Sequence, residues 1–178
     1  MSITLSGWIT FVKMSVPSNR LIAELSYHIR TGASKEWSEF GVLWSAFNAV
    51  YGGEPDPKER ARVMACIRGH FSERGALRAL RAATKSIDKI LALPPGDMRL
   101  EVWNPAFRAA SQRCAALYRD RNATAVARLA AVGGVLYQVR CNLIHGSKDP
   151  RSPRDRMLVH ESVLVLRALV PALEEELK

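Results

Sequence analysis

The most constraining feature of the sequence is the spacing of its large apolar residues, which recur every three or four positions over long stretches. Between residues 37 and 50 they form one broad stripe on a helix, made of Trp37, Phe40, Leu43, Trp44, Phe47 and Val50. Proline and glycine clusters separate such stretches, and no segment has a convincing strand pattern. The sequence therefore predicts an all-α fold.

Caps and helix breakers divide the chain into a short arm and one helical domain. Residues 1–18 are predicted to be an irregular or extended arm, and residues 19–178 a single domain without an internal linker. The predicted helices span residues 19–30, 35–51, 57–72, 76–91, 105–119, 124–145 and 154–177. Trp103 is expected to pack against the domain. Gly133-Gly134 either interrupts a helix or lets a neighbouring helix approach closely.

Composition narrows the class of protein. The 178 residues suit one domain, and 48% hydrophobic residues are enough for a sizeable core. The net charge of +9 favours contact with RNA, DNA or nucleotides, although an arginine-rich compositional bias would give the same charge. Three widely spaced cysteines argue against a disulfide framework. With no signal-peptide pattern and no apolar run of membrane-spanning length, we expect a cytoplasmic protein.

The segment Val139–Lys148 places an arginine, an asparagine, a histidine and a lysine within ten residues at a predicted helix end. Gly146 suits the position just after the helix, because glycine adopts the left-handed conformation without strain. His145 would then lie in the last turn, where the helix dipole favours a positive charge. Such a histidine can take up and hold a proton near neutral pH.

The spacing within this segment leaves its geometry open. Arg140 and His145 lie about 140° apart around an ideal helix, whereas Asn142 and His145 share a face. The long Arg140 side chain can extend toward the helix end, or a second subunit can complete the site. The sequence does not choose between these two arrangements.

Two segments together resemble the HEPN-domain family. Trp44-Ser45-Ala46-Phe47-Asn48-Ala49-Val50-Tyr51-Gly52 resembles the W-x-A-F-N-x-x-Y-G helix of many of its bacterial members. Arg140-Cys141-Asn142-Leu143-Ile144-His145-Gly146-Ser147-Lys148 resembles their R-N-x-L-x-H-G-x-K stretch. The segments occur in the expected order, and the resemblance covers most of residues 35–175.

The resemblance implies an up-down helical bundle that usually dimerises, with the two Arg-x4-His motifs meeting at the dimer interface. In active members the histidine deprotonates the ribose 2′-OH or protonates the leaving oxygen, and the arginine holds the scissile phosphate. No metal or cofactor is needed, and the products are a 2′,3′-cyclic phosphate and a 5′-OH. By position, Arg140 and His145 would be the catalytic residues, a pair of groups suited to this chemistry.

Other residues receive supporting roles. Asn142, Lys148 and Arg151 are candidates for contacts with the substrate. Trp44 is expected to pack in the core rather than stack on bases, and Asn48, if buried, would be hydrogen-bonded and orient the motif helix.

The motif departs from the family at two positions. Cys141 stands where active members usually place a polar residue, and we expect it to pack. Ser147 stands where the compact toxin branch has a tyrosine. The chain therefore looks closer to the abortive-infection and defence group.

The sequence predicts a metal-independent endoribonuclease of a bacterial toxin or anti-phage defence system. Its expected partners are RNA, a second copy of the chain and a neutralising or activating protein. One alternative is a non-catalytic HEPN module that binds RNA or nucleotides or acts as a sensor subunit. Another is a helical interaction protein whose partner surface is the apolar side of the last helix, formed by Leu158, Val165, Leu166, Leu169 and Leu173. No metal site is expected, because His28, His70 and His160 lack ligand spacing.

Overall fold

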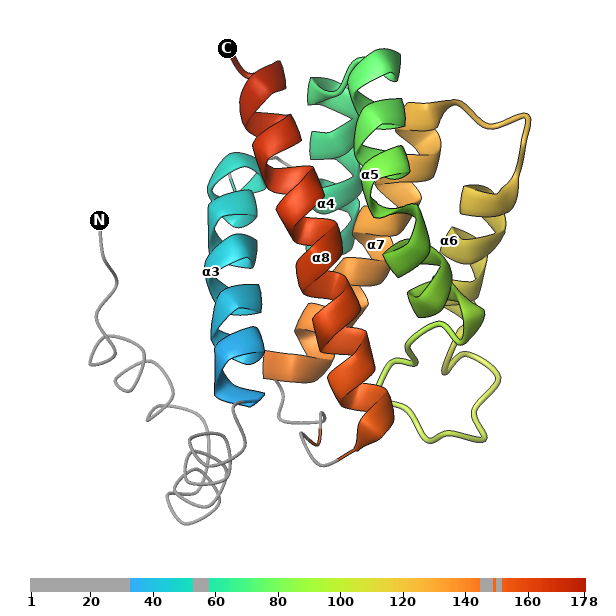
Figure 1. Ribbon diagram of the computed structural model, residues 1–178. Coiled ribbons are helices and arrows are strands. Elements are labelled where there is room, and N and C mark those ends of the chain that lie inside the picture. Colours follow the sequence, from blue (N-terminus) through green and yellow to red (C-terminus); the bar gives the residue numbers. More distant parts are fainter. Residues whose placement is uncertain (1–32, 53–57, 145–148, 150–151) are drawn as a thin grey trace. The chain divides into compact units, whose positions relative to one another are not determined.

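The computed structural model describes residues 33–52, 58–144, 149 and 152–178. These residues form six α-helices and no strand (Figure 1), which confirms the predicted all-α fold. The helices are α3 (Ala33–Tyr51), α4 (Glu59–His70), α5 (Glu73–Ala92), α6 (Ala109–Arg119), α7 (Ala125–Ile144) and α8 (Pro153–Glu176). The chain divides into Met1–Lys35 and Glu36–Lys178, and the packing described below belongs to the second unit. The predicted arm at 1–18 and helix at 19–30 lie outside the described residues.

Most helix ends lie within a few residues of the predicted ones. Ser72 and Ser152 set the starts of α5 and α8, because each side chain accepts a hydrogen bond from a backbone N–H of the first turn. The prediction for residues 105–119 is wrong at its start, since α6 begins at Ala109. Before this helix, the Asn104 side chain accepts the backbone N–H of Ala106 at 2.9 Å and so closes a tight turn.

Helix α7 is the centre of this unit and packs against α4, α5, α6 and α8. Two glycines make this close approach possible. A Cβ atom on Gly133 would lie 2.5 Å from Cδ1 of Ile67 in α4, and one on Gly134 would lie 3.1 Å from Sγ of Cys114 in α6. A side chain at either position would crowd its neighbour. The glycines therefore serve close packing, and the alternative that they interrupt the helix is wrong, because α7 runs through both.

Two pairs of packed helices, α5 with α8 and α4 with α7, run in opposite directions. Glu176, at the end of α8, accepts hydrogen bonds from the backbone N–H and the hydroxyl of Ser72 at the start of α5, both at 3.0 Å. Lys89, near the end of α5, reaches Glu161 early in α8 at 2.6 Å. Arg60, at the start of α4, donates to Gln138 near the end of α7. These pairs make α5 antiparallel to α8 and α4 antiparallel to α7, as in an up-down bundle.

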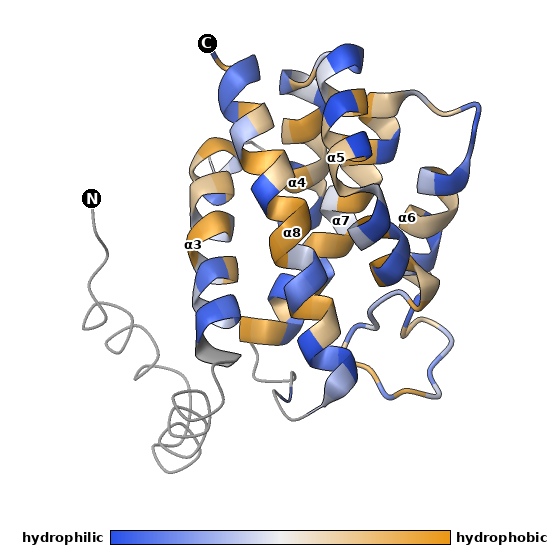
Figure 2. Cartoon of the chain, in the orientation of Figure 1, coloured by the Kyte–Doolittle hydropathy of each residue, from blue (hydrophilic) through white to orange (hydrophobic). Residues whose placement is uncertain are grey.

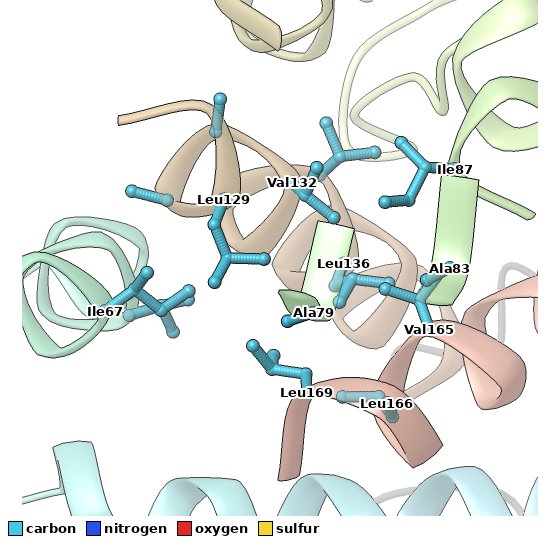
Figure 3. Close-up of a cluster of buried hydrophobic side chains, with 14 of the residues drawn as sticks. Ile67, Ala79, Ala83, Ile87, Leu129, Val132, Leu136, Val165, Leu166 and Leu169 are labelled. Carbon is cyan, nitrogen blue, oxygen red and sulfur yellow. The ribbon is translucent and has the colours of Figure 1, made fainter. Parts of the chain in front are cut away.

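The core lies where α4, α5, α7 and α8 meet, and Figure 3 shows its side chains pointing toward one another. Each large side chain buried there contributes about 1.5–3 kcal/mol through the hydrophobic effect. Figure 2 shows hydrophobic residues alternating with hydrophilic ones around the helices. The apolar residues of the last helix face this core and are at most 2% exposed, namely Leu158, Val165, Leu166, Leu169 and Leu173. The prediction that they form a partner surface is therefore wrong.

The segment between α5 and α6, residues 93–108, forms a loop that we call the α5–α6 loop (Figure 1). Its two ends meet, because the Asp97 N–H donates to the Phe107 carbonyl at 2.6 Å. Gly96 is required at this meeting point, since a Cβ there would lie 2.2 Å from the Phe107 ring. Trp103 is 81% exposed, so the prediction that it packs is wrong. The α5–α6 loop is closed by contacts within itself, and the Trp103 ring is left exposed to solvent.

Candidate functional site at the end of α7

Arg140 lies four residues before the end of α7, and its side chain is 25% exposed. Its Nη1 donates to Glu59 Oε2 at 3.2 Å, and Glu59 belongs to the first turn of α4. The structure thus joins two residues that are far apart in sequence. Because both side chains are mostly shielded from water, the carboxylate fixes the position of the guanidinium more firmly than an exposed partner would.

Glu59 also binds a second group. The Tyr51 hydroxyl, at the end of α3, donates to Glu59 Oε1 at 2.8 Å. Burial, and then this hydrogen bond, raises the pKa of Tyr51 well above its usual range. The phenol therefore stays protonated and acts as a permanent donor. Glu59 consequently bridges α3 and α7, with one oxygen on Tyr51 and the other on Arg140.

Asn142 lies inside the protein and is only 2% exposed. Its Nδ2 donates to the Gly96 carbonyl at 2.8 Å, and its Oδ1 accepts from Gln138 Nε2 at 3.0 Å. The Met98 N–H approaches the same oxygen at 3.5 Å. The expected contact between Asn142 and substrate does not fit this geometry, because both ends of its amide are engaged within the fold. The side chain instead attaches the α5–α6 loop to α7.

Cys141 packs against Tyr137, one turn earlier in α7. Burial, and then the hydrogen bond to Cys141, raises the pKa of Tyr137 to about 12. The Arg60 guanidinium lies 5.5 Å from the centre of the Tyr137 ring, within range of a cation–π interaction. The expectation that Cys141 is a packing residue agrees with this arrangement.

The two residues expected to support the motif, Trp44 and Asn48, differ in their burial. Trp44 is 5% exposed and stacks on Phe40 with ring centres 6.0 Å apart, so its predicted packing in the core is confirmed. Asn48 is exposed. Its backbone carbonyl accepts the Gly52 N–H at 2.8 Å, where α3 ends. The condition under which Asn48 would orient the motif helix, burial of its side chain, is not met.

Three of the predicted site residues, His145, Lys148 and Arg151, lie outside the described residues. In the sequence, His145 directly follows Ile144, the last residue of α7. The geometry of the Arg140–His145 pair therefore stays a prediction.

An open pocket of about 230 Å³ lies between α4 and α6. Its lining consists of two arginines and four less polar residues, namely Arg60, Arg113, Met64, Ala110, Cys114 and Leu117. The two helices carry five arginines and one carboxylate. Guanidinium groups around an apolar floor suit a phosphate-bearing ligand. The sequence analysis did not identify this pocket, because Arg60 and Arg113 come together only through packing.

Glu59 was also not predicted from the sequence to belong to the site. The available signal was its place in the first turn of a predicted helix, where a carboxylate is favoured by the helix dipole. That signal explains an acidic residue but not its partners. Tyr51 and Arg140 meet Glu59 only because α3 and α7 converge on the start of α4.

Two further properties concern only the part of the chain that the structure describes. Within this part, no three histidine, cysteine or carboxylate side chains gather into a group able to hold a metal ion. None of the helices there combines the length and the apolar character needed to cross a bilayer.

Comparison of the chain with protein-family models, with curated protein sequences and with solved structures found no match.

Proposed function

We propose that the chain is a HEPN-type, metal-independent endoribonuclease that acts as a homodimer. The observation that carries this proposal is the position of Arg140, four residues before the end of α7 with its guanidinium held by Glu59 at 3.2 Å. His145 of the Arg-x4-His motif follows in the sequence. The resemblance further suggests a role in a bacterial toxin or anti-phage defence system, in the cytoplasm and with a neutralising or activating protein partner.

In the proposed reaction, His145 removes the proton from a ribose 2′-OH, and the resulting oxygen attacks the adjacent phosphorus. The bond from phosphorus to the 5′-oxygen breaks, and that oxygen takes a proton from an imidazolium, either His145 or the same residue of the second copy. The products are a 2′,3′-cyclic phosphate and a 5′-OH. Arg140 binds the phosphate and the negative charge that develops on it.

In the proposed reaction, Glu59 and Asn142 have structural roles. Glu59 fixes the Arg140 guanidinium before substrate arrives, which lowers the entropy lost when the phosphate binds. Asn142 is not proposed to contact substrate, because its amide is buried and hydrogen-bonded to Gly96 and Gln138. Lys148 and Arg151 keep their proposed contacts with RNA phosphates.

The test is cleavage of total RNA in EDTA, followed by analysis of the RNA ends. We expect the wild type to leave 2′,3′-cyclic phosphates, and His145→Ala to lose about 100-fold or more of the rate. Arg140→Lys should also be impaired, because lysine lacks the forked donor group. Matched controls are His160→Ala and Arg167→Ala, which remove from α8 a histidine hydrogen-bonded to Glu36 and an arginine ion-paired with Glu39. Full activity of His145→Ala would contradict the proposal.

A second candidate function is a non-catalytic module that binds RNA or nucleotides as a sensor or interaction subunit. The observation that favours it is Cys141, which stands where active members usually place a polar residue and is hydrogen-bonded to Tyr137 within the fold. Binding of RNA by the wild type without cleavage, and with weaker binding by Arg140→Ala, would support this candidate.

A further inference from the structure

The α5–α6 loop exposes an unusual set of apolar side chains. Trp103 is 81% exposed and Val102 is 70% exposed, with Met98 and Leu93 each at 42%. Large apolar residues gathered on a surface often mark a binding site, and tryptophan is the residue for which this signal is strongest. The ring lies in solvent although the core of the same unit is tightly packed.

The loop is fixed to the end of α7 by the candidate site itself. The Asn142 amide donates to Gly96 at 2.8 Å, and Gly96 lies against the Phe107 ring. The closure between Asp97 and Phe107 at 2.6 Å brings the two ends of the loop together. Compact surface loops with closed ends are frequently functional. Asn142 therefore ties the loop that bears Trp103 to the turn that bears Arg140.

The α5–α6 loop carries two arginines as well as Trp103. Arg99 is held by Asp97 at 2.6 Å with its side chain 76% exposed, and Arg108 lies 5.5 Å from the centre of the Phe107 ring. An exposed indole on a loop that also carries Arg99 and Arg108, in a chain of net charge +9, matches the chemistry of single-stranded RNA. Such strands bind by stacking a base on an aromatic ring while arginines contact the phosphates.

We infer that Trp103 stacks on a base of a single-stranded RNA bound at the end of α7, and that Asn142 positions the loop for this contact. The inference rests on the proposed function, because it takes RNA as the ligand of the same site. It adds a base contact to the phosphate contacts of Arg140. Stacking tolerates every base, so the contact strengthens binding without specifying a sequence.

The experiment uses the full chain in EDTA and a fluorescein-labelled single-stranded oligonucleotide of 2′-O-methyl ribonucleotides. This probe has no free 2′-OH, so it reports binding without cleavage. We expect Trp103→Ala to weaken binding about 5- to 150-fold, the range given by loss of one stacked base. Trp103→Phe should keep most of the affinity, and Val42→Ala, a control at an exposed apolar residue of α3, should bind as the wild type does. The slope of affinity against salt should be the same for Trp103→Ala and the wild type, since no charge is removed.

Intrinsic fluorescence supplies a second measurement. The oligonucleotide should quench the emission of the wild type, and most of this quenching should disappear in Trp103→Phe. Normal binding by Trp103→Ala overturns the inference, as does a change in its oligomeric state with unchanged affinity for the oligonucleotide. If either result is obtained while the wild type still cuts RNA through His145, the inference about Trp103 fails and the proposed function is unaffected. A wild type that neither binds the probe nor cuts RNA overturns both.

Discussion

The middle and the end of α7 show two different ways of holding one helix. From Leu129 to Leu136 every residue is buried, and the helix is held by apolar contacts and by the close approach at its two glycines. Near the end of the helix, Arg140 and Asn142 are held by hydrogen bonds to Glu59 and Gly96. Apolar contacts are not directional and tolerate small shifts, whereas each buried polar group needs a specific partner. The middle of α7 therefore contributes most of the stability of its packing, and the end of α7 fixes the positions of its polar side chains.

The largest effect should come from the middle. Leu136→Ala removes a fully buried side chain at the centre of the core and leaves a cavity. We expect the free energy of unfolding to fall by about 2–5 kcal/mol. The measurement is urea denaturation followed by circular dichroism. Leu77→Ala is the matched control, because Leu77 is 36% exposed, and its loss should be clearly smaller. Equal losses would mean that the middle of α7 is not the main apolar support.

An intermediate effect is expected at the end of α7. Asn142→Ala leaves the Gly96 carbonyl and the Gln138 amide without the partner that they have in the structure. We expect a loss of about 1–3 kcal/mol in the free energy of unfolding. Amide exchange should also become faster in the α5–α6 loop than elsewhere.

The control for this prediction is Asn48→Ala, which changes an exposed asparagine and should alter stability by about 0.5 kcal/mol or less. Unchanged exchange in the α5–α6 loop of Asn142→Ala would show that the loop does not depend on this side chain.

The smallest effect concerns the base of the α5–α6 loop. The hydrogen bond from Arg99 holds the pKa of Asp97 below its ordinary value of 3.8. A carboxyl group with a lowered pKa in the folded state stabilises the fold above its unfolded pKa. That stabilisation is lost as the pH falls through the lower, folded pKa. Because Arg99 is largely exposed, solvent screening should keep the contribution below about 1 kcal/mol.

Urea denaturation between about pH 2 and about pH 6 tests this prediction. Asp97→Asn should flatten the decline of stability below about pH 4, and Arg99→Gln should flatten it to a similar extent. A decline in both variants equal to that of the wild type would exclude this pair as a source of the acid sensitivity.

The two halves of α7 also differ in how well the sequence predicted them. The apolar periodicity predicted the helix and its burial, and Gly133-Gly134 indicated close packing as one of two alternatives. At the helix end, the sequence singled out Arg140 but not its partner, because Glu59 lies 81 positions away and nothing in the spacing connects them. Asn142 was predicted to meet substrate, although its side chain is buried on the α5–α6 loop. Trp103 was predicted to pack because it is large and apolar, and its exposure depends on how the loop folds.

By itself, the sequence determined the helical class and the approximate helix ends in the described part of the chain. These features depend on local properties, namely the spacing of apolar residues, the capping serines and the helix-breaking prolines and glycines. Only the tertiary structure decided that Glu59 binds both Tyr51 and Arg140, that Asn142 fixes a loop and that Trp103 faces solvent. Those contacts join residues from separate helices, and the orientation of a polar side chain is set by whichever partner packing brings within hydrogen-bonding distance.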